Sequence, residues 1–207
     1  MTTNAHRYFI LNKPYNMVSQ FVSSHPVRLL GEIKFDFPEG THAIGRLDNH
    51  TEGLLILTTD TRVTKLLFQG TKKHQRTYYA LVLKKVTDET VEQLRKGVDF
   101  LAAGNKMYTS APCEVDIVDE PNFIFPSPYK KTQYLEYTWL KISLTEGKYH
   151  QVRKMVWAVK HRCVRLIRTS IEDLCLEDLT AGAIREMGEE DFFTKLKIDI
   201  PLNKEVK

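Results

Sequence analysis

Two carboxylates stand close together in the stretch AIGRLDNHTEGLLILTTD, residues 43–60. Asp48 follows a Gly-Arg-Leu sequence, and Glu52 lies just before an apolar run that is typical of a buried strand. A glycosidase would use two such groups, one as the acid and the other as the nucleophile or base. Asp48 could serve as a nucleophile if a guanidinium or backbone N–H groups kept it ionised. Glu52 could instead cap the turn or bind Arg46, so both interpretations stay open at this point.

Other catalytic centres find little support among the reactive side chains. The histidines are scattered, and no acidic cluster completes a metal ligand set with them: they are His6, His25, His42, His50, His74, His150 and His161. Cys113, Cys163 and Cys175 lack C-x-x-C spacing, which indicates reduced thiols rather than a zinc site or a disulfide framework. The chain has no GxxxxGK[ST] or GxGxxG motif. The sequence therefore predicts neither a metal site nor a cradle for nucleotide phosphates.

Positive charge is concentrated in two segments of the chain. Residues 72–85 contain five Lys or Arg and no acid, and residues 141–168 contain eight Lys or Arg and one acid. From residue 170 onward acids outnumber bases by ten to five. This separation favours a polyanion-binding face over ordinary solvated faces. Nucleic acid is the favoured polyanion because aromatic and His side chains lie among the cations: Tyr78, Tyr79, Tyr149, His150, Trp157 and His161.

Length and composition set the class of protein. With 207 residues, 42% apolar and 27% charged, the chain fits a soluble globular protein of one domain or two small lobes. No apolar run approaches membrane-spanning length, and residues 1–8 lack the apolar core of a secretory signal. We therefore expect a cytoplasmic protein with no membrane partner.

The predicted elements indicate an α+β fold with a mostly antiparallel sheet. We expect strands early in residues 7–21, with a turn at Pro14 and a second short strand, and again at 53–60, 77–86 and 133–147. Short helices are predicted at 61–68 and 87–97, short strands over 98–118 and 163–176, and short helices after them. The segment 120–131 contains three prolines and is predicted to be a long ordered loop.

Residues 148–160 are predicted to form a helix with two usable faces. One face carries the apolar residues Val152, Met155, Val156 and Val159. The adjacent face carries His150, Arg153, Trp157 and Lys160. One face can pack on the sheet while the other meets a ligand.

The stretch GRLDNHTEGLLILTT resembles the signature of the RsuA-type ribosomal RNA pseudouridine synthases. Every fixed position of that signature is met between Gly45 and Thr58. LNKPYNMVSQF, RTYYALV, EGKYHQVRKM and the segment that begins VRLIRTSIEDL resemble further family motifs in the expected order, and together they cover residues 7–187. The resemblance is strongest to members that modify large-subunit ribosomal RNA. Arg76 stands where the family commonly has Lys.

The resemblance implies the pseudouridine synthase fold, a mixed but mostly antiparallel sheet flanked by helices with a catalytic cleft between two lobes. It implies one catalytic domain over residues 1–207 without an N-terminal S4 domain. The reaction breaks the N1–C1′ bond of a uridine and rejoins the uracil through C5, so no cofactor is expected. The partner is ribosomal RNA, no obligatory protein partner is indicated, and the chain is predicted to be a monomer. A non-catalytic RNA-binding ribosome-assembly factor is the alternative.

The resemblance also implies roles for individual residues. Asp48 acts at the sugar, either by attacking C1′ or by taking a sugar proton to give a glycal. Arg153 is the partner of that carboxylate, and Tyr78 stacks on the base and is the route for the C5 proton. Arg46 holds a phosphate or fills the space left by the flipped uridine. The predicted RNA-binding residues are Arg46, Arg76, Lys148, His150, Lys154 and Lys160.

Overall fold

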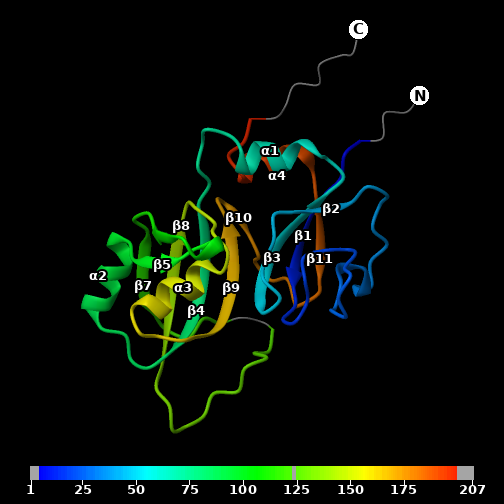
Figure 1. The fold of residues 1–207 in the computed structure, drawn as a ribbon. Coiled ribbons are helices and arrows are strands. Elements are labelled where there is room, and N and C mark those ends of the chain that lie inside the picture. The colour runs from blue at the N-terminus through cyan, green and yellow to red at the C-terminus, as the bar shows by residue number, and fades with distance from the viewer. Residues whose placement is uncertain (1–4, 123–124, 200–207) are drawn as a thin grey trace.

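A computed structural model describes residues 5–122 and 125–199 of the chain. The described residues form a nine-stranded mixed sheet in the order β11-β1-β3-β9-β4-β8-β7, with β2 paired to β3 and β10 paired to β9, and a separate two-stranded sheet, β5-β6 (Figure 1). The strands are β1 Tyr8–Lys13, β2 His42–Ile44, β3 Thr51–Thr58, β4 Arg76–Leu83, β5 Asp99–Leu101, β6 Met107–Thr109, β7 Glu114–Val118, β8 Tyr137–Leu144, β9 Cys163–Ile171, β10 Leu174–Cys175 and β11 Ile184–Met187. The helices are α1 Arg62–Phe68, α2 Asp88–Lys96, α3 Gln151–Ala158 and α4 Glu189–Lys195, with 3-10 turns η1 Leu30–Glu32 and η2 Ala103–Asn105.

The two halves of the large sheet meet where β3 lies parallel to β9. This is the only parallel pairing among the described strands, and it joins Thr51, Glu52 and Gly53 to Leu166, Ile167 and Arg168. Gly53 has φ +101°, and a Cβ built on it would lie 2.2 Å from the carbonyl oxygen of Arg168. The residue must therefore be glycine for the strands to approach this closely.

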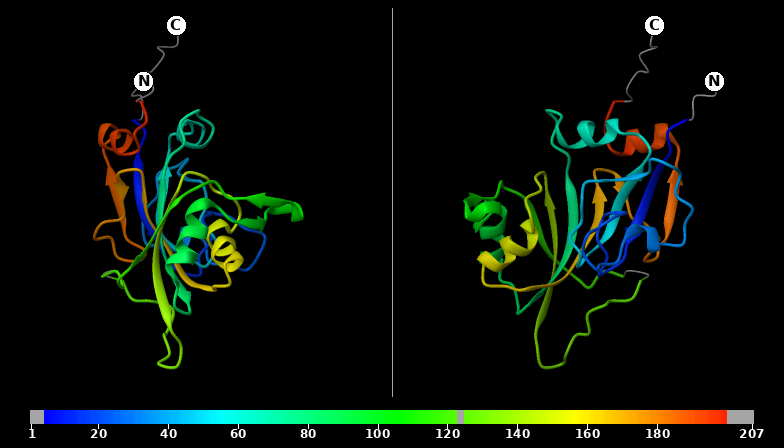
Figure 2. Two further views of the ribbon diagram at one scale, coloured as in Figure 1. Left: turned by 90° about the vertical axis from the view of Figure 1, so that its left-hand side faces the viewer. Right: turned by 45° about the vertical axis from the view of Figure 1, so that its right-hand side comes forward.

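The helices pack on the sheet as two pairs. Figures 1 and 2 show α2 and α3 side by side against the β4–β8 half, whereas α1 and α4 lie together at one end of the molecule. The first pair buries Val91, Leu94, Met155 and Val156 with residues of β4 and β8 in one core cluster. The second pair packs on the central strands through Val63, Leu67, Phe192 and Phe193. This second cluster also contains Leu81 of β4 and Trp139 of β8, so it spans both halves of the sheet.

Most of the predicted elements are confirmed, with three corrections. The α+β class, the antiparallel bias, the buried strand β3 and the capped helix α2 agree with expectation; the Thr87 hydroxyl accepts from the N–H of Thr90 at the start of α2. The predicted second strand before residue 21 is absent, because the chain there turns and bends. The segment after β10 forms strand β11 before helix α4, and β2 was not predicted. Residues 123–124 of the predicted loop lie outside the described residues.

The third correction concerns the helix predicted at residues 148–160, which spans only Gln151–Ala158. Its apolar face is buried as expected, at Val152, Met155 and Val156. His150 at its start and Lys160 after its end both have positive φ, 56° and 67°. Left-handed backbone cannot continue an α-helix. His150 and Lys160 therefore do not share the helical face on which they were placed.

None of the four described helices is long and apolar enough to cross a membrane.

Candidate active site

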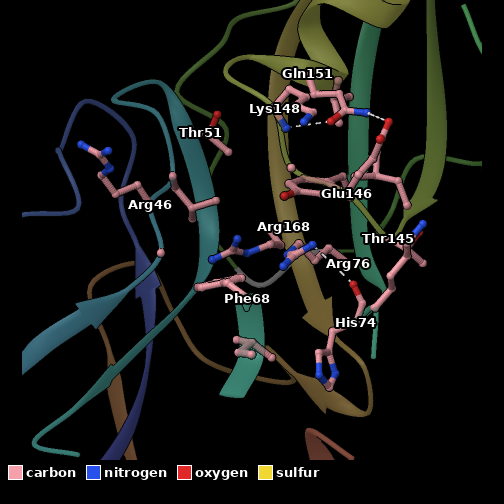
Figure 3. A pocket seen from close by; sticks show the side chains of 18 of the residues that line it. Arg46, Thr51, Phe68, His74, Arg76, Thr145, Glu146, Lys148, Gln151 and Arg168 are labelled. Atoms are coloured by element: carbon pink, nitrogen blue, oxygen red, sulfur yellow. Dashed lines mark hydrogen bonds between the residues drawn. The ribbon is translucent and has the colours of Figure 1, made fainter. Parts of the chain in front are cut away.

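A cavity of about 460 Å³ lies between the two halves of the sheet. Three segments line it, residues 45–51 before and at the start of β3, residues 67–78 from α1 into β4, and residues 144–152 from β8 into α3. Leu166 and Arg168 of β9 complete the wall. Figure 3 shows side chains from all three segments converging on the space around Arg168 and Arg76. The predicted cleft is therefore present between the halves.

Asp48 lies in a tight turn that leads into β3. Its carbonyl accepts a hydrogen bond from the N–H of Thr51 at 3.0 Å. On one side, the Leu47 N–H donates to the Ser19 hydroxyl at 2.9 Å. On the other side, the Asn49 carbonyl accepts from the N–H of Met17 at 3.2 Å. Hydrogen bonds thus hold the residues on both sides of Asp48. The Asp48 side chain is 29% exposed and lines the cavity.

Lys13 at the end of β1 joins this turn to residues 14–17 through hydrogen bonds. Its side chain is fully buried, and Nζ donates to the carbonyl oxygens of Pro14 at 2.9 Å, Met17 at 2.5 Å and Asn49 at 3.4 Å. Burial lowers the pKa of Lys13 to about 7, although the nearby carboxylates of Glu52 and Asp48 oppose this. The hydrogen bonds of the buried Lys13 amine therefore fix the conformation of residues 14–17, which form no strand.

His150 lies next to Asp48 in the wall of the cavity. Its Nε2 lies 3.4 Å from Asp48 Oδ1, a distance that gives an ion pair when the imidazole is protonated. The ring of Tyr149 stacks on the imidazole, and the two ring centroids are 3.9 Å apart. His150 has a left-handed backbone, with φ 56°, and lines the cavity.

Arg153 does not form the predicted ion pair with Asp48 in this structure. Its Nη2 donates to the carbonyl oxygen of His50 at 2.8 Å, and Nη1 donates to that of Cys163 at 3.3 Å. Arg153 therefore joins α3 to the chain two residues beyond Asp48, and its guanidinium is committed to backbone acceptors.

Arg168, Tyr78 and Gly53 stand in register across three neighbouring strands. Arg168 on β9 is paired with Gly53 on β3 and with Tyr78 on β4. Arg168 is 3% exposed; its Nε donates to the Leu54 carbonyl at 2.9 Å, while Nη2 is buried without a hydrogen-bond partner among the described residues. The half-buried Tyr78 lines the same cavity. The sheet thus brings the predicted aromatic residue beside a buried cation.

Arg76 adds a second buried guanidinium to this wall. It is 8% exposed and lies over the ring of Phe68, 5.1 Å from the centroid. Burial lowers the pKa of Arg76, and the neighbouring Arg168 acts in the same direction. A wall with two desolvated cations and an unpartnered donor is suited to a ligand that carries oxygen acceptors.

Glu52 has a structural partner on the opposite face of the sheet. Arg165 donates to both of its carboxylate oxygens, at 2.8 and 2.9 Å, and both side chains are about 5% exposed or less. Because side chains alternate along a strand, Thr51 lines the cavity and Glu52 points away from it. The partner is Arg165 rather than the proposed Arg46. Glu52 therefore lies outside the cavity. The other described carboxylate that lines the cavity, Glu146, accepts hydrogen bonds from the Ala111 N–H and the Gln151 amide. This arrangement does not fit a glycosidase that uses Asp48 and Glu52 together.

Comparison with known proteins identifies the family. The family model described as RNA pseudouridylate synthase matches residues 7–158. The chain belongs to this family. The synthase is 32% identical to "Ribosomal large subunit pseudouridine synthase E" of Vibrio parahaemolyticus, covering 87% of this chain and 74% of the relative. It is 34% identical to the protein of that name from Xanthomonas axonopodis pv. citri, covering 82% and 88%.

Further likenesses agree with this assignment. "Ribosomal small subunit pseudouridine synthase A" of Escherichia coli is 31% identical, covering 89% of this chain and 72% of the relative. A solved structure titled "Crystal structure of pseudouridylate synthase" superposes with a TM-score of 0.74 at 27% identity, covering 95% of the synthase and 76% of that chain. The predicted family and fold are confirmed.

The predicted RNA-binding residues of the synthase fall into three groups. Arg46, Arg76, Lys148 and His150 line the cavity, although Figure 3 shows the exposed Arg46 guanidinium pointing away from Arg168. Lys154 lines a neighbouring cavity with Arg153, and Nζ lies 5.1 Å from the centroid of the Tyr149 ring. Lys160 is exposed and lines neither cavity.

Two features of the synthase's site escaped sequence reasoning. Arg168 was counted only as a positive charge, although a cation between the apolar residues of a buried strand is itself a signal of function. Glu146 accepts from Tyr108 Oη, the Ala111 N–H at 3.0 Å and the Gln151 amide, and so fixes the loop before α3. Among the described residues no group of three or more His, Cys, Asp or Glu is arranged to hold a metal ion.

Proposed function

We propose that this synthase converts a uridine of large-subunit ribosomal RNA to pseudouridine. The relatives of 32–34% identity named for the large subunit support this substrate class. In the reaction the N1–C1′ bond breaks and a C5–C1′ bond forms. C5 loses its proton and N1 gains one, so atoms and electrons balance without a co-reactant.

One observation carries the proposal: Asp48 and Tyr78 line the same cavity from opposite sides of the buried Arg168. A uridine flipped out of its stack would place its sugar at the Asp48 turn and its base along the Tyr78–Arg168 wall. Arg168 Nη2 and the buried, unpartnered hydroxyl of Thr51 would then meet the acceptors of the uracil.

Asp48 is the group that acts at the sugar in this proposal. It either attacks C1′ as a nucleophile or takes the sugar proton whose loss gives a glycal. Both routes require its carboxylate to reach the sugar, and Asp48 lines the cavity with 29% of its side chain exposed. His150 at 3.4 Å supplies a polar neighbour without occupying both oxygens.

Tyr78 and Arg153 have different tasks. Tyr78 packs on the uracil ring, and its hydroxyl relays the C5 proton after re-attachment: the oxygen accepts that proton and releases its own to solvent. Arg153, through the His50 carbonyl, is a positioning residue for the Asp48 turn. This replaces the ion pair with Asp48 that the sequence predicted, and it keeps Arg153 important for turnover.

RNA would approach over a surface that carries Arg46, Arg76, Lys148, His150 and Lys154. Such contacts with phosphates make affinity fall steeply with salt. Action as a monomer in the cytoplasm stays a prediction.

The test is pseudouridine mapping of total ribosomal RNA from cells with and without this synthase. We expect one or a few large-subunit uridines to lose modification when it is removed and to regain it when the wild-type chain is restored. Restoration of ribosome assembly without any change in the pseudouridine map would contradict the proposal and favour the non-catalytic assembly factor.

A further inference from the structure

A second cavity, of about 450 Å³, lies beside the active site on the outer side of α3. Its walls include Phe100 and Leu101 of β5, Trp157 and Lys154 of α3, and Arg162 before β9. His150 lines this cavity and also the cavity that contains Asp48. The two cavities are therefore neighbours that share one imidazole as part of their walls. We call the second one the Trp157 pocket.

Two large apolar side chains of the Trp157 pocket are exposed, although the opposite face of α3 packs in a hydrophobic core. Trp157 is 68% exposed and Leu101 is 51% exposed. On the other face of α3, Val152, Met155 and Val156 are all buried against the sheet. Packing of the helix thus uses that face and leaves the indole without a role in the core. Exposed aromatic groups at the edge of a functional cavity are typical of a surface that binds a ligand.

The rim of the Trp157 pocket is positively charged. Arg153, Lys154 and Arg162 line it, and the one carboxylate among its lining residues, Asp99, accepts a hydrogen bond from the Thr109 hydroxyl. Cations around an open indole match the chemistry of a nucleotide, which joins a flat apolar base to an anionic phosphate. An acidic or purely apolar protein segment would satisfy only one of these two features.

We propose that the Trp157 pocket binds an unpaired base of the same RNA strand, close to the uridine held at Asp48. This inference rests on the proposed function, because it places both nucleotides on one substrate. The shared wall at His150 gives the route: a strand with one nucleotide in the first cavity crosses this residue to reach the second. The base stacks on the Trp157 indole, and Lys154 and Arg162 lie at the rim for its phosphates.

This assignment explains why Trp157 would contribute to affinity without selecting a sequence. Every base offers a π-face, so stacking on an indole tolerates any of them. Selection of the modified uridine would then depend on the first cavity, where Arg168 and Thr51 present polar groups. The Trp157 pocket would require only that a nearby nucleotide be unpaired.

Intrinsic fluorescence tests the proposal directly, because Trp157 and the buried Trp139 are the two tryptophans of the chain. The probe is a single-stranded oligouridylate of about a dozen nucleotides, a length typical of single-strand binding sites. Its matched control is an abasic oligomer with the same number of phosphates. We expect the oligouridylate to quench the emission, and the abasic strand to bind without quenching. In the Trp157→Phe protein the remaining Trp139 emission should not change.

Affinity gives a second measurement that does not depend on emission. By fluorescence anisotropy, Trp157→Ala should weaken oligouridylate binding by about five- to a hundredfold. Trp157→Phe should retain most of the affinity because a ring remains. The same Trp157→Ala change should leave binding of the abasic strand unaltered. As a control for loss of any exposed ring, Tyr134→Ala should have no effect, since Tyr134 is 85% exposed and lines neither cavity.

Several results would overturn the proposal. Oligouridylate that saturates the protein without changing Trp157 emission would assign this face to something other than RNA, such as a protein. Equal losses of affinity for the oligouridylate and the abasic strand in Trp157→Ala would show that no base occupies the pocket. Base-dependent quenching in a protein that forms no pseudouridine would support the pocket and refute the proposed reaction, so the two failures are distinguishable.

Discussion

His150 Nε2 lies 3.4 Å from Asp48 Oδ1, although the two residues belong to opposite halves of the sheet. Asp48 precedes β3 and His150 precedes α3, so the contact depends on the parallel pairing of β3 with β9 that holds the halves together. The active-site geometry is thus a consequence of how these two strands meet. This gives the first prediction.

Gly53→Ala should separate the two halves. The new Cβ would meet the Arg168 carbonyl oxygen at 2.2 Å, and the residue would keep a φ of +101°. We expect the free energy of unfolding to fall by more than about 3 kcal/mol, measured by urea denaturation with circular dichroism. Gly40→Ala is the control, because Gly40 has φ +79° but open space around it, and its cost should be about 1 kcal/mol. Equal stability of the two variants would contradict the close-approach argument.

Glu52→Gln should destabilise the fold while sparing the chemistry. The change leaves the Arg165 guanidinium buried without its carboxylate, which typically costs about 3–5 kcal/mol. The double variant Glu52→Gln/Arg165→Met should recover much of that loss because both charges are removed. Pseudouridine formed per folded molecule should stay near the wild-type value in both. A specific loss of turnover in a fully folded Glu52→Gln protein would show that the Glu52 carboxylate takes part in the reaction.

Tyr78→Phe should retain RNA binding and lose turnover. The ring remains in register with Arg168 and can still pack on the base, whereas the hydroxyl that takes the C5 proton is gone. The measurement is single-turnover pseudouridine formation at saturating RNA, with the dissociation constant determined in parallel. Turnover at the wild-type rate would make Tyr78 a packing residue.

Lys13→Met should change how stability depends on pH. Burial lowers the pKa of Lys13 to about 7 in the folded protein, from an ordinary value of 10.5. Between these values the unfolded chain binds more protons than the folded one, so this lysine makes stability rise with pH. The stability of wild type relative to Lys13→Met should therefore increase from about pH 7 to about pH 9, by up to about 1.4 kcal/mol per pH unit.

The control for this pH profile is Lys85→Met, because Lys85 is exposed. Its stability should follow that of wild type in parallel across the same range. A constant gap between wild type and Lys13→Met would mean that the Lys13 amine keeps its ordinary protonation in the folded state.

The sequence predicted the elements whose patterns are local. β3 contains the apolar run Leu54–Leu57, and α2 has Thr87 at its start and Gly97 after its end. It did not predict β11, because Ile184–Met187 has no strand pattern of its own and becomes a strand by pairing with β1. The turn at Pro14 was predicted, but the second strand expected after it is absent, and the hydrogen bonds of the buried Lys13 amine that hold this segment cannot be seen in a pattern of apolar residues.

The candidate site was predictable where a motif marked it. The signature led to Asp48, and the strand motif led to Tyr78, which lies across the cavity from it. The sequence marks Arg168 as a cation within an apolar strand, but its position beside Gly53 and the Glu52–Arg165 pair depend on contacts between residues far apart in the chain. Arg153 shows the same limit: its place in the chain was known, but its acceptors are backbone oxygens that only the fold brings near.

The central claim is that the Asp48 carboxylate performs the chemistry at the sugar, and Asp48→Asn tests it most directly. The amide preserves the shape of the side chain and removes its charge. Large-subunit ribosomal RNA treated with wild type, Asp48→Asn or Glu52→Gln/Arg165→Met would be mapped for pseudouridine, with circular dichroism to check folding. We predict that Asp48→Asn folds and binds RNA normally but forms pseudouridine at least about 10³-fold more slowly, a loss of about 4 kcal/mol of transition-state stabilisation. A folded Asp48→Asn protein that isomerises uridine at close to the wild-type rate would contradict the account.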